Sequence, residues 1–76
     1  MKTLLVRGDS DPPRELREMI QAGSTEVDEV RGVRDPWQRG ADRVVIWNGR
    51  DVIVDDRRLR WPDDLDVVRM LLQTGG

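Results

Sequence analysis

The chain has 76 residues and a mass of 8.8 kDa, so we treat residues 1–76 as one small domain. Charged residues and hydrophobic residues each make up 37% of the sequence, and the formal net charge is −2. Because the chain has no cysteine and no histidine, disulfides, thiolate chemistry, zinc sites and histidine-based acid–base catalysis are excluded.

Acidic and basic residues are interspersed along the whole chain. The basic residues are twelve arginines and Lys2, a preference typical of GC-rich bacterial or phage genomes. Acidic residues are mixed among them in both halves, so we expect no nucleic-acid partner. The longest apolar runs, such as Val44–Trp47, are too short for a membrane span or a signal peptide. We therefore expect a cytoplasmic protein with no membrane partner.

The first elements are a strand and a helix. The apolar run Thr3–Val6 predicts a strand that is covered on both faces. After a polar turn, Asp11 is a good N-cap and Pro12 a good first helical residue. Gly23 stands where a C′ glycine ends a helix. The apolar stripe of this helix is Leu16, Met19 and Ile20.

The middle of the chain combines weak and strong signals. Thr25–Arg31 carries two valines three residues apart among acids, which predicts a weak edge strand. Asp35–Gly40 predicts a single helical turn, with Asp35 as its cap. Arg43–Trp47 predicts a strong apolar strand.

A hairpin and a last helix follow. Asn48-Gly49 favours a type I′ turn, because both residues tolerate positive φ, and it joins Arg43–Trp47 to a return strand over Asp51–Val54. After the turn at Asp55-Asp56, Arg58–Trp61 predicts a third strand that Pro62 ends. Asp63 or Asp64 then caps a helix, whose stripe is Leu65, Val68, Leu71 and Leu72, with Val67 and Met70 beside it.

The predicted order is β-α-β-(turn)-β-β-β-α. The strand–helix–strand unit favours a parallel pair with a right-handed crossover, whereas the hairpins are antiparallel. The fold class is therefore α/β, a small mixed-sheet sandwich of two or three layers. In layout it resembles a miniature Rossmann-like fold, and a shared layout implies no activity.

Asp9-Ser10-Asp11 follows the first strand and resembles two acidic motifs. One is the nucleophile motif of haloacid-dehalogenase-type phosphatases, which implies Asp9 as nucleophile, Asp11 as acid or base, and magnesium at both. The other is the acid pair of receiver domains. Neither motif is complete here, because Pro12-Pro13 follows the acids and the only lysine is Lys2.

The chain ends in Gly75-Gly76, which resembles the tail of ubiquitin-like and sulfur-carrier proteins. The resemblance covers Leu71 to Gly76 and implies that the carboxylate of Gly76 is activated. In that family the tail leaves a strand, whereas here it follows a predicted helix. A helix stop at Gly75 is the structural alternative.

Three tryptophans are the only aromatic residues. We assign Trp47 to the core, and Trp37 either caps the core or protrudes. Trp61 ends the Arg58–Trp61 strand, which we expect at a sheet edge. Arginine and tryptophan are enriched at binding hot spots, and an edge strand offers unpaired main-chain groups.

The preferred function is a non-enzymatic interaction or regulatory module that docks a protein partner through this edge strand. Its expected partner-binding residues are Arg58, Arg60, Trp61 and Trp37. No cofactor and no metal are expected, and a homodimer is possible in principle. The alternatives are a carrier acting through Gly75-Gly76 and a degenerate receiver-like or phosphatase-like domain using Asp9 and Asp11.

Overall fold

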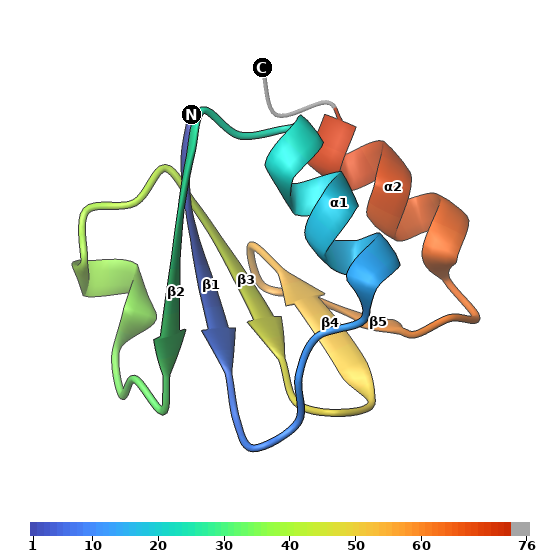
Figure 1. The fold of residues 1–76 in the computed structure, drawn as a ribbon, viewed down its shortest axis with the longest axis horizontal. Coiled ribbons are helices and arrows are strands. Elements are labelled where there is room, and N and C mark those ends of the chain that lie inside the picture. Colours follow the sequence, from blue (N-terminus) through green and yellow to red (C-terminus); the bar gives the residue numbers. More distant parts are fainter. Residues whose placement is uncertain (74–76) are drawn as a thin grey trace.

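The computed structural model describes residues 1–73, which form a mixed sheet of five strands and two helices (Figure 1). This confirms the expected small mixed α/β fold. Along the chain the elements are β1 (Lys2–Arg7), α1 (Arg14–Ala22), β2 (Glu26–Arg31), the 3₁₀ turn η1 (Pro36–Gln38), β3 (Arg43–Trp47), β4 (Asp51–Val54), β5 (Arg57–Arg60) and α2 (Leu65–Gln73).

The strands lie in the order β2-β1-β3-β4-β5. β1 is parallel to both β2 and β3, whereas β4 is antiparallel to β3 and to β5. The expected parallel β1–β2 pair and the antiparallel hairpins are therefore confirmed. β2 and β5 are the two edges of the sheet, as the weak strand and the last strand of the sequence were expected to be.

Both helices pack on the same face of the sheet, side by side (Figure 1). The main core lies between them and this face. Its buried members are Leu5, Leu16, Met19, Ile20, Val45, Trp47, Val52, Val54, Val68 and Leu72. The fold is thus built of two layers, and Trp47 belongs to the core as expected.

The sheet face turned away from α1 and α2 is here called the far face. Leu4, Val6 and Val44 form a small buried cluster on it, covered by the segment between β2 and β3. Val30 packs against this small cluster, whereas Val27 packs against the main core. This division explains the three-residue spacing of the β2 valines, because each serves a different face.

The start of α1 differs from the prediction. The helix begins at Arg14, and Pro13 is its N-cap without a side-chain hydrogen bond. Asp11 is therefore not the cap, and Pro12 is not the first helical residue. The carboxylate of Asp11 accepts a hydrogen bond from Arg7 instead. Asp11 thus forms an ion pair with an arginine of β1 in place of a capping bond within its own turn.

The two other predicted caps stand at the predicted positions: Asp35 is the N-cap of η1, and the carbonyl of Asp64 accepts from the N–H of Val68 in α2 at 3.0 Å. Their side chains, however, do not bond as capping side chains were expected to. Asp35 makes no side-chain cap bond, although its carbonyl accepts from the N–H of Gln38 at 3.1 Å. The carboxylate of Asp64, just before α2, accepts from the N–H of Arg60 at 2.8 Å. In both cases the sequence predicts the helix boundary correctly, but it does not predict which atoms form hydrogen bonds there.

Gly23 ends α1 for a different reason from the one predicted. Its φ is −95°, so it does not adopt the left-handed C′ conformation. A Cβ atom at this position would lie 2.3 Å from the carbonyl oxygen of Leu72 on α2. Glycine is therefore needed here because the two helices approach each other closely.

The turn at Asn48-Gly49 is not of type I′. Gly49 has a φ of +93°, but Asn48 is not in the positive-φ region. The side-chain oxygen of Asn48 instead accepts hydrogen bonds from the N–H groups of Arg50 and Asp51, at 3.0 and 2.6 Å. Positive φ at two successive residues, the mark of a type I′ turn, occurs at Asp55-Asp56 between β4 and β5.

Candidate functional site

β5 places two exposed arginines on the far face of the sheet edge. Val52 and Val54 of β4 and Leu59 of β5 contribute to the main core, so the alternating residues Arg58 and Arg60 point to the far face. The side chain of Arg58 is 68% exposed, and Arg60 is also exposed. Their guanidinium groups are therefore available to a partner in solvent.

The main chain of β5 is only partly open. The N–H of Trp61 donates to the carbonyl of Arg50 at 3.4 Å, which fixes the alternation of hydrogen-bonded pairs along the β4–β5 ladder. By this alternation the N–H and C=O groups of Arg58 and Arg60 point away from β4. Asp64 occupies both groups of Arg60, accepting from its N–H at 2.8 Å and donating to its C=O at 2.9 Å.

Arg58 alone on β5 thus presents an open N–H and C=O among the residues the structure describes. We call the side chains of Arg58 and Arg60, together with the main chain of Arg58, the β5 edge surface. It offers two cations and one residue of free strand edge. A long added strand is blocked at Arg60, so side-chain contacts dominate what this surface can bind.

A hollow of about 460 Å³ adjoins the β5 edge surface, lined by Arg50, Asp51, Arg58, Arg60 and Asp64. Its acids are already engaged. The carboxylate of Asp51 lies 3.7 Å from Arg58, and that of Asp64 accepts the N–H of Arg60. The guanidinium groups of Arg50 and Arg60 have no ion pair within residues 1–73, so the hollow favours an incoming carboxylate.

The tryptophans predicted to bind a partner are not brought together. Trp61 follows β5, is half-buried and packs against the main core. Trp37 is 50% exposed and therefore protrudes. It belongs to η1, which lies beside β2 at the opposite edge of the sheet (Figure 1). A single small partner at β5 would thus meet Arg58, Arg60 and the exposed part of Trp61.

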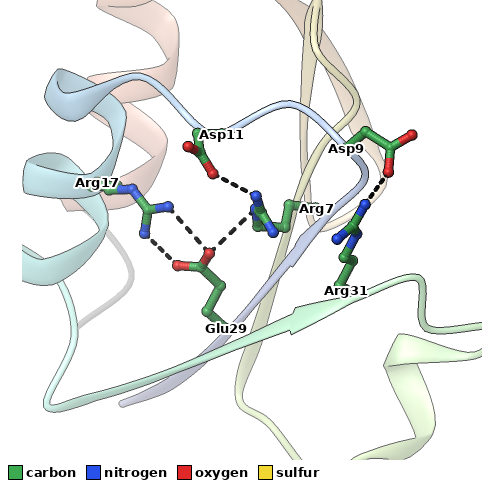
Figure 2. A network of polar contacts seen from close by, with 6 residues as sticks. All are labelled: Arg7, Asp9, Asp11, Arg17, Glu29 and Arg31. Carbon is green, nitrogen blue, oxygen red and sulfur yellow. Dashed lines mark hydrogen bonds and ion pairs between the residues drawn. The ribbon is translucent and has the colours of Figure 1, made fainter.

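A second group of polar residues lies where β1 and β2 end (Figure 2). Arg17 of α1 makes two hydrogen bonds to the carboxylate of Glu29 on β2, the longer at 3.1 Å. Nε of Arg7 lies 3.4 Å from the same carboxylate, and its guanidinium also donates to Asp11. These bonds tie the β1–α1 loop and α1 to β2.

The charges in this group shift one another's titration. The hydrogen bond from Arg17 is the main cause of the lowered pKa of Glu29, and burial opposes it. The same bond raises the pKa of Arg17. Both groups thus stay charged at neutral pH, as an ion pair between a helix and an edge strand requires.

Asp9 and Asp11, the acids of the phosphatase-like and receiver-like alternatives, each pair with a different arginine. Asp11 accepts from Arg7, whereas Asp9 accepts from Arg31 in a separate pair (Figure 2). Within the described part of the chain, no group of three acidic side chains is placed to hold a metal ion. These ion pairs can hold the β1–α1 loop in place, since each of the two carboxylates is neutralised by an arginine.

Three members of the hollow, Arg50, Asp51 and Asp64, were missed in the sequence analysis. Arg50 enters it only because the β4–β5 register brings the turn after β3 beside Trp61. Asp64 was assigned to helix capping, and no local signal distinguishes a cap from a bond to the preceding strand. The prediction for Gly75-Gly76 lies outside the described residues.

Comparison of the chain with protein-family models, with curated proteins and with solved structures found no match. The β5 edge surface therefore has to be judged by its own geometry and charge. Within residues 1–73, neither helix has the length and apolar character that crossing a membrane requires.

Proposed function

We propose that this chain is a non-enzymatic interaction module that docks an acidic segment of a protein partner at the β5 edge surface. The observation that carries the proposal is the pair of exposed arginines at an open sheet edge, next to the unpaired main chain of Arg58. Arginine is a favourable anchor for carboxylates, because its guanidinium group donates paired, charge-assisted hydrogen bonds.

Charge supports an acidic partner. Of the ionised groups around the hollow, Asp51 and Asp64 already make contacts within the fold, whereas the guanidinium groups of Arg50 and Arg60 make no ion pair with any of residues 1–73. A carboxylate approaching this surface gains charge-assisted hydrogen bonds without breaking an existing pair at Arg60. Such charged contacts raise the association rate and the selectivity of binding more than they raise the affinity.

The same proposal includes the finer expectations about layout and location. β2 is added on one side of β1, and β3 is then added on the other side of β1. This change of side in the strand order supports a Rossmann-like layout. We propose that the layout serves here as a scaffold for an exposed edge and not as a catalytic framework. The cytoplasmic location stays a prediction from the sequence.

The proposal is tested by affinity capture from a lysate of the source cells. The chain carries an N-terminal tag, so that its C-terminus stays free, and bound proteins are identified by mass spectrometry. The test variant is Arg58→Glu with Arg60→Glu. The matched control is Arg14→Glu with Arg34→Glu, since these arginines are also exposed and make no ion pair within residues 1–73.

We expect the control to capture as much partner as the wild type does. The test variant should capture at least about tenfold less, which corresponds to a loss of about 1.4 kcal/mol in binding free energy. Retention by both variants would place docking elsewhere on the molecule. Loss from both would mean attraction by net charge alone. A covalent adduct at Gly76 would favour the carrier alternative, and loss of a measured activity in Asp9→Asn would favour the enzyme.

A further inference from the structure

The two edges of the sheet carry opposite charges on the same face. On β5 the far-face residues are Arg58 and Arg60. On β2 they are Glu26 and Asp28, which lie opposite Lys2 and Leu4 of β1 in the register. We propose that the β2 edge of a second copy of this chain occupies the β5 edge surface, so that copies join head to tail. This inference rests on the proposed function and names its partner.

The β2 edge suits this role because it is long and exposed. The strand has six residues, and every second one directs its N–H and C=O away from β1. Glu26 and Asp28 have side-chain exposures of 60% and 50%. Lys2 lies 3.6 Å from Glu26 and 3.4 Å from Asp28, so one cation is shared by two acids. Arg39 lines a hollow beside Lys2 and Asp28 and makes no ion pair with Asp28 within residues 1–73.

The strand directions allow the sheet to continue from one copy into the next. β2, β1 and β3 run parallel, and two antiparallel steps bring β5 back to the direction of β2. A second copy shifted along the sheet thus sets its β2 parallel to β5. Both copies then keep their helices on the same side.

In one register of β2 against β5, opposite charges face each other and apolar side chains face each other as well. Setting Glu26 opposite Arg58 also sets Val27 opposite Leu59 and Asp28 opposite Arg60. Val27 and Leu59 are both partly buried against the main core of their own copy. Across the contact, the far face gains two opposite-charge pairs and the helix-bearing face gains an apolar pair.

The bonds of Asp64 to Arg60 limit the contact. Because the main chain of Arg60 is occupied, main-chain pairing is confined to Arg58, and Arg60 contributes its side chain only. The association is therefore short and dominated by exposed charges. Such contacts are weakened by salt, whose screening length falls from about 30 Å at 0.01 M to about 8 Å at 0.15 M.

Contacts between like edges are disfavoured. Antiparallel pairing of β2 with β2 brings acids against acids, and pairing of β5 with β5 brings arginines against arginines. Only the contact between unlike edges brings opposite charges together. Such a heterologous contact leaves one edge open on each end, so that assembly grows with protein concentration.

The test is sedimentation velocity of the chain over a wide range of protein concentration, at low and at high salt. We expect the mean sedimentation coefficient of the wild type to rise with concentration at low salt and to fall back to that of the monomer at high salt. Glu26→Arg with Asp28→Arg, and Arg58→Glu with Arg60→Glu, are each expected to stay monomeric. Circular dichroism confirms that each variant is folded.

The decisive variant carries all four substitutions. It exchanges the charges of the two edges and keeps the net charge of the wild type, so we expect it to self-associate again. A wild type that stays monomeric at every concentration overturns the inference, as does a fourfold variant that stays monomeric when the wild type assembles. If the wild type is monomeric but Arg58→Glu with Arg60→Glu still loses its captured partner, the inference fails and the proposed function stands. If Arg58→Glu with Arg60→Glu self-associates and also captures the partner as the wild type does, the inference and the proposed function both fail.

Discussion

Gly23 is the residue at which the two helices come closest. A Cβ built there lies 2.3 Å from the carbonyl oxygen of Leu72, a main-chain atom that cannot rotate away. We expect Gly23→Ala to lower the free energy of unfolding by about 1–3 kcal/mol, because α2 must shift. Urea unfolding measures it. The matched control is Gly8→Ala, where the added Cβ meets nothing within 4 Å, and equal stability of the two variants would contradict this account.

Gly49 holds the turn between β3 and β4 through its backbone conformation. Its φ of +93° is strained for any other residue, and an added Cβ lies 3.1 Å from Oγ of Ser10. We expect Gly49→Val to cost about 1 kcal/mol or more, since a β-branched side chain resists positive φ. Thermal unfolding gives the result. An unchanged melting temperature would show that this turn does not depend on the positive φ.

Residue types at turns and helix ends were easier to predict than their bonding. Asn48-Gly49 and Asp64 lie at the predicted boundaries and Asp11 lies in the turn before α1, but the partners of all three differ from the prediction. Short polar side chains satisfy whichever donor the tertiary structure brings closest. A capping bond within the turn competes with a bond to a neighbouring strand, and only the folded chain decides between them.

Among the elements, α1 and β2 are joined by Glu29. Its pKa is lowered chiefly by the hydrogen bond from Arg17, so its stabilising contribution is present above the ordinary glutamate pKa and is lost as the pH falls through the lowered value. We expect Glu29→Gln to cost about 0.5–1 kcal/mol at pH 7, as exposed ion pairs do. As the pH falls through the lowered pKa of Glu29, the wild type and the variant should converge in urea unfolding.

That convergence distinguishes a charge effect from a packing effect. Gln and Glu have nearly the same shape, so the small hollow that Glu29 lines together with Leu5, Ile20 and Val27 is retained. A stability difference that stays constant as the pH falls through the lowered pKa of Glu29 would mean that the Arg17–Glu29 pair does not stabilise the fold. In that case the contact between α1 and β2 would depend on the apolar side chains alone.

Strands and helices could be predicted because their signals are local. The apolar runs of β1 and β3 and the helical stripes of α1 and α2 are written in neighbouring residues. The positions of β5 and β2 at the edges followed from their charge. The place of Arg50 could not be predicted, because it depends on the register of the β4–β5 ladder. The bond from Arg60 to Asp64 could not be predicted, because the same carboxylate is equally suited to cap α2.

At the scale of the whole molecule, the main core and the groups proposed to dock a partner lie on opposite faces of the sheet. One face is covered by both helices and holds the main core. The far face carries a small apolar cluster near β1 and exposed charges at both edges. A domain of this size has little surplus stability, and confining the docking groups to exposed edge positions leaves its core intact.

The most direct test of docking at β5 is amide hydrogen exchange of the chain, compared between the free protein and the complex recovered by affinity capture. The N–H of Arg58 has no partner within residues 1–73, so we expect it to exchange quickly in the free protein. We expect slowed exchange in the complex over residues 56–61 and an unchanged rate over residues 8–13. Protection confined to residues 8–13 or to α2, with residues 56–61 still exchanging freely, would contradict docking at the β5 edge surface.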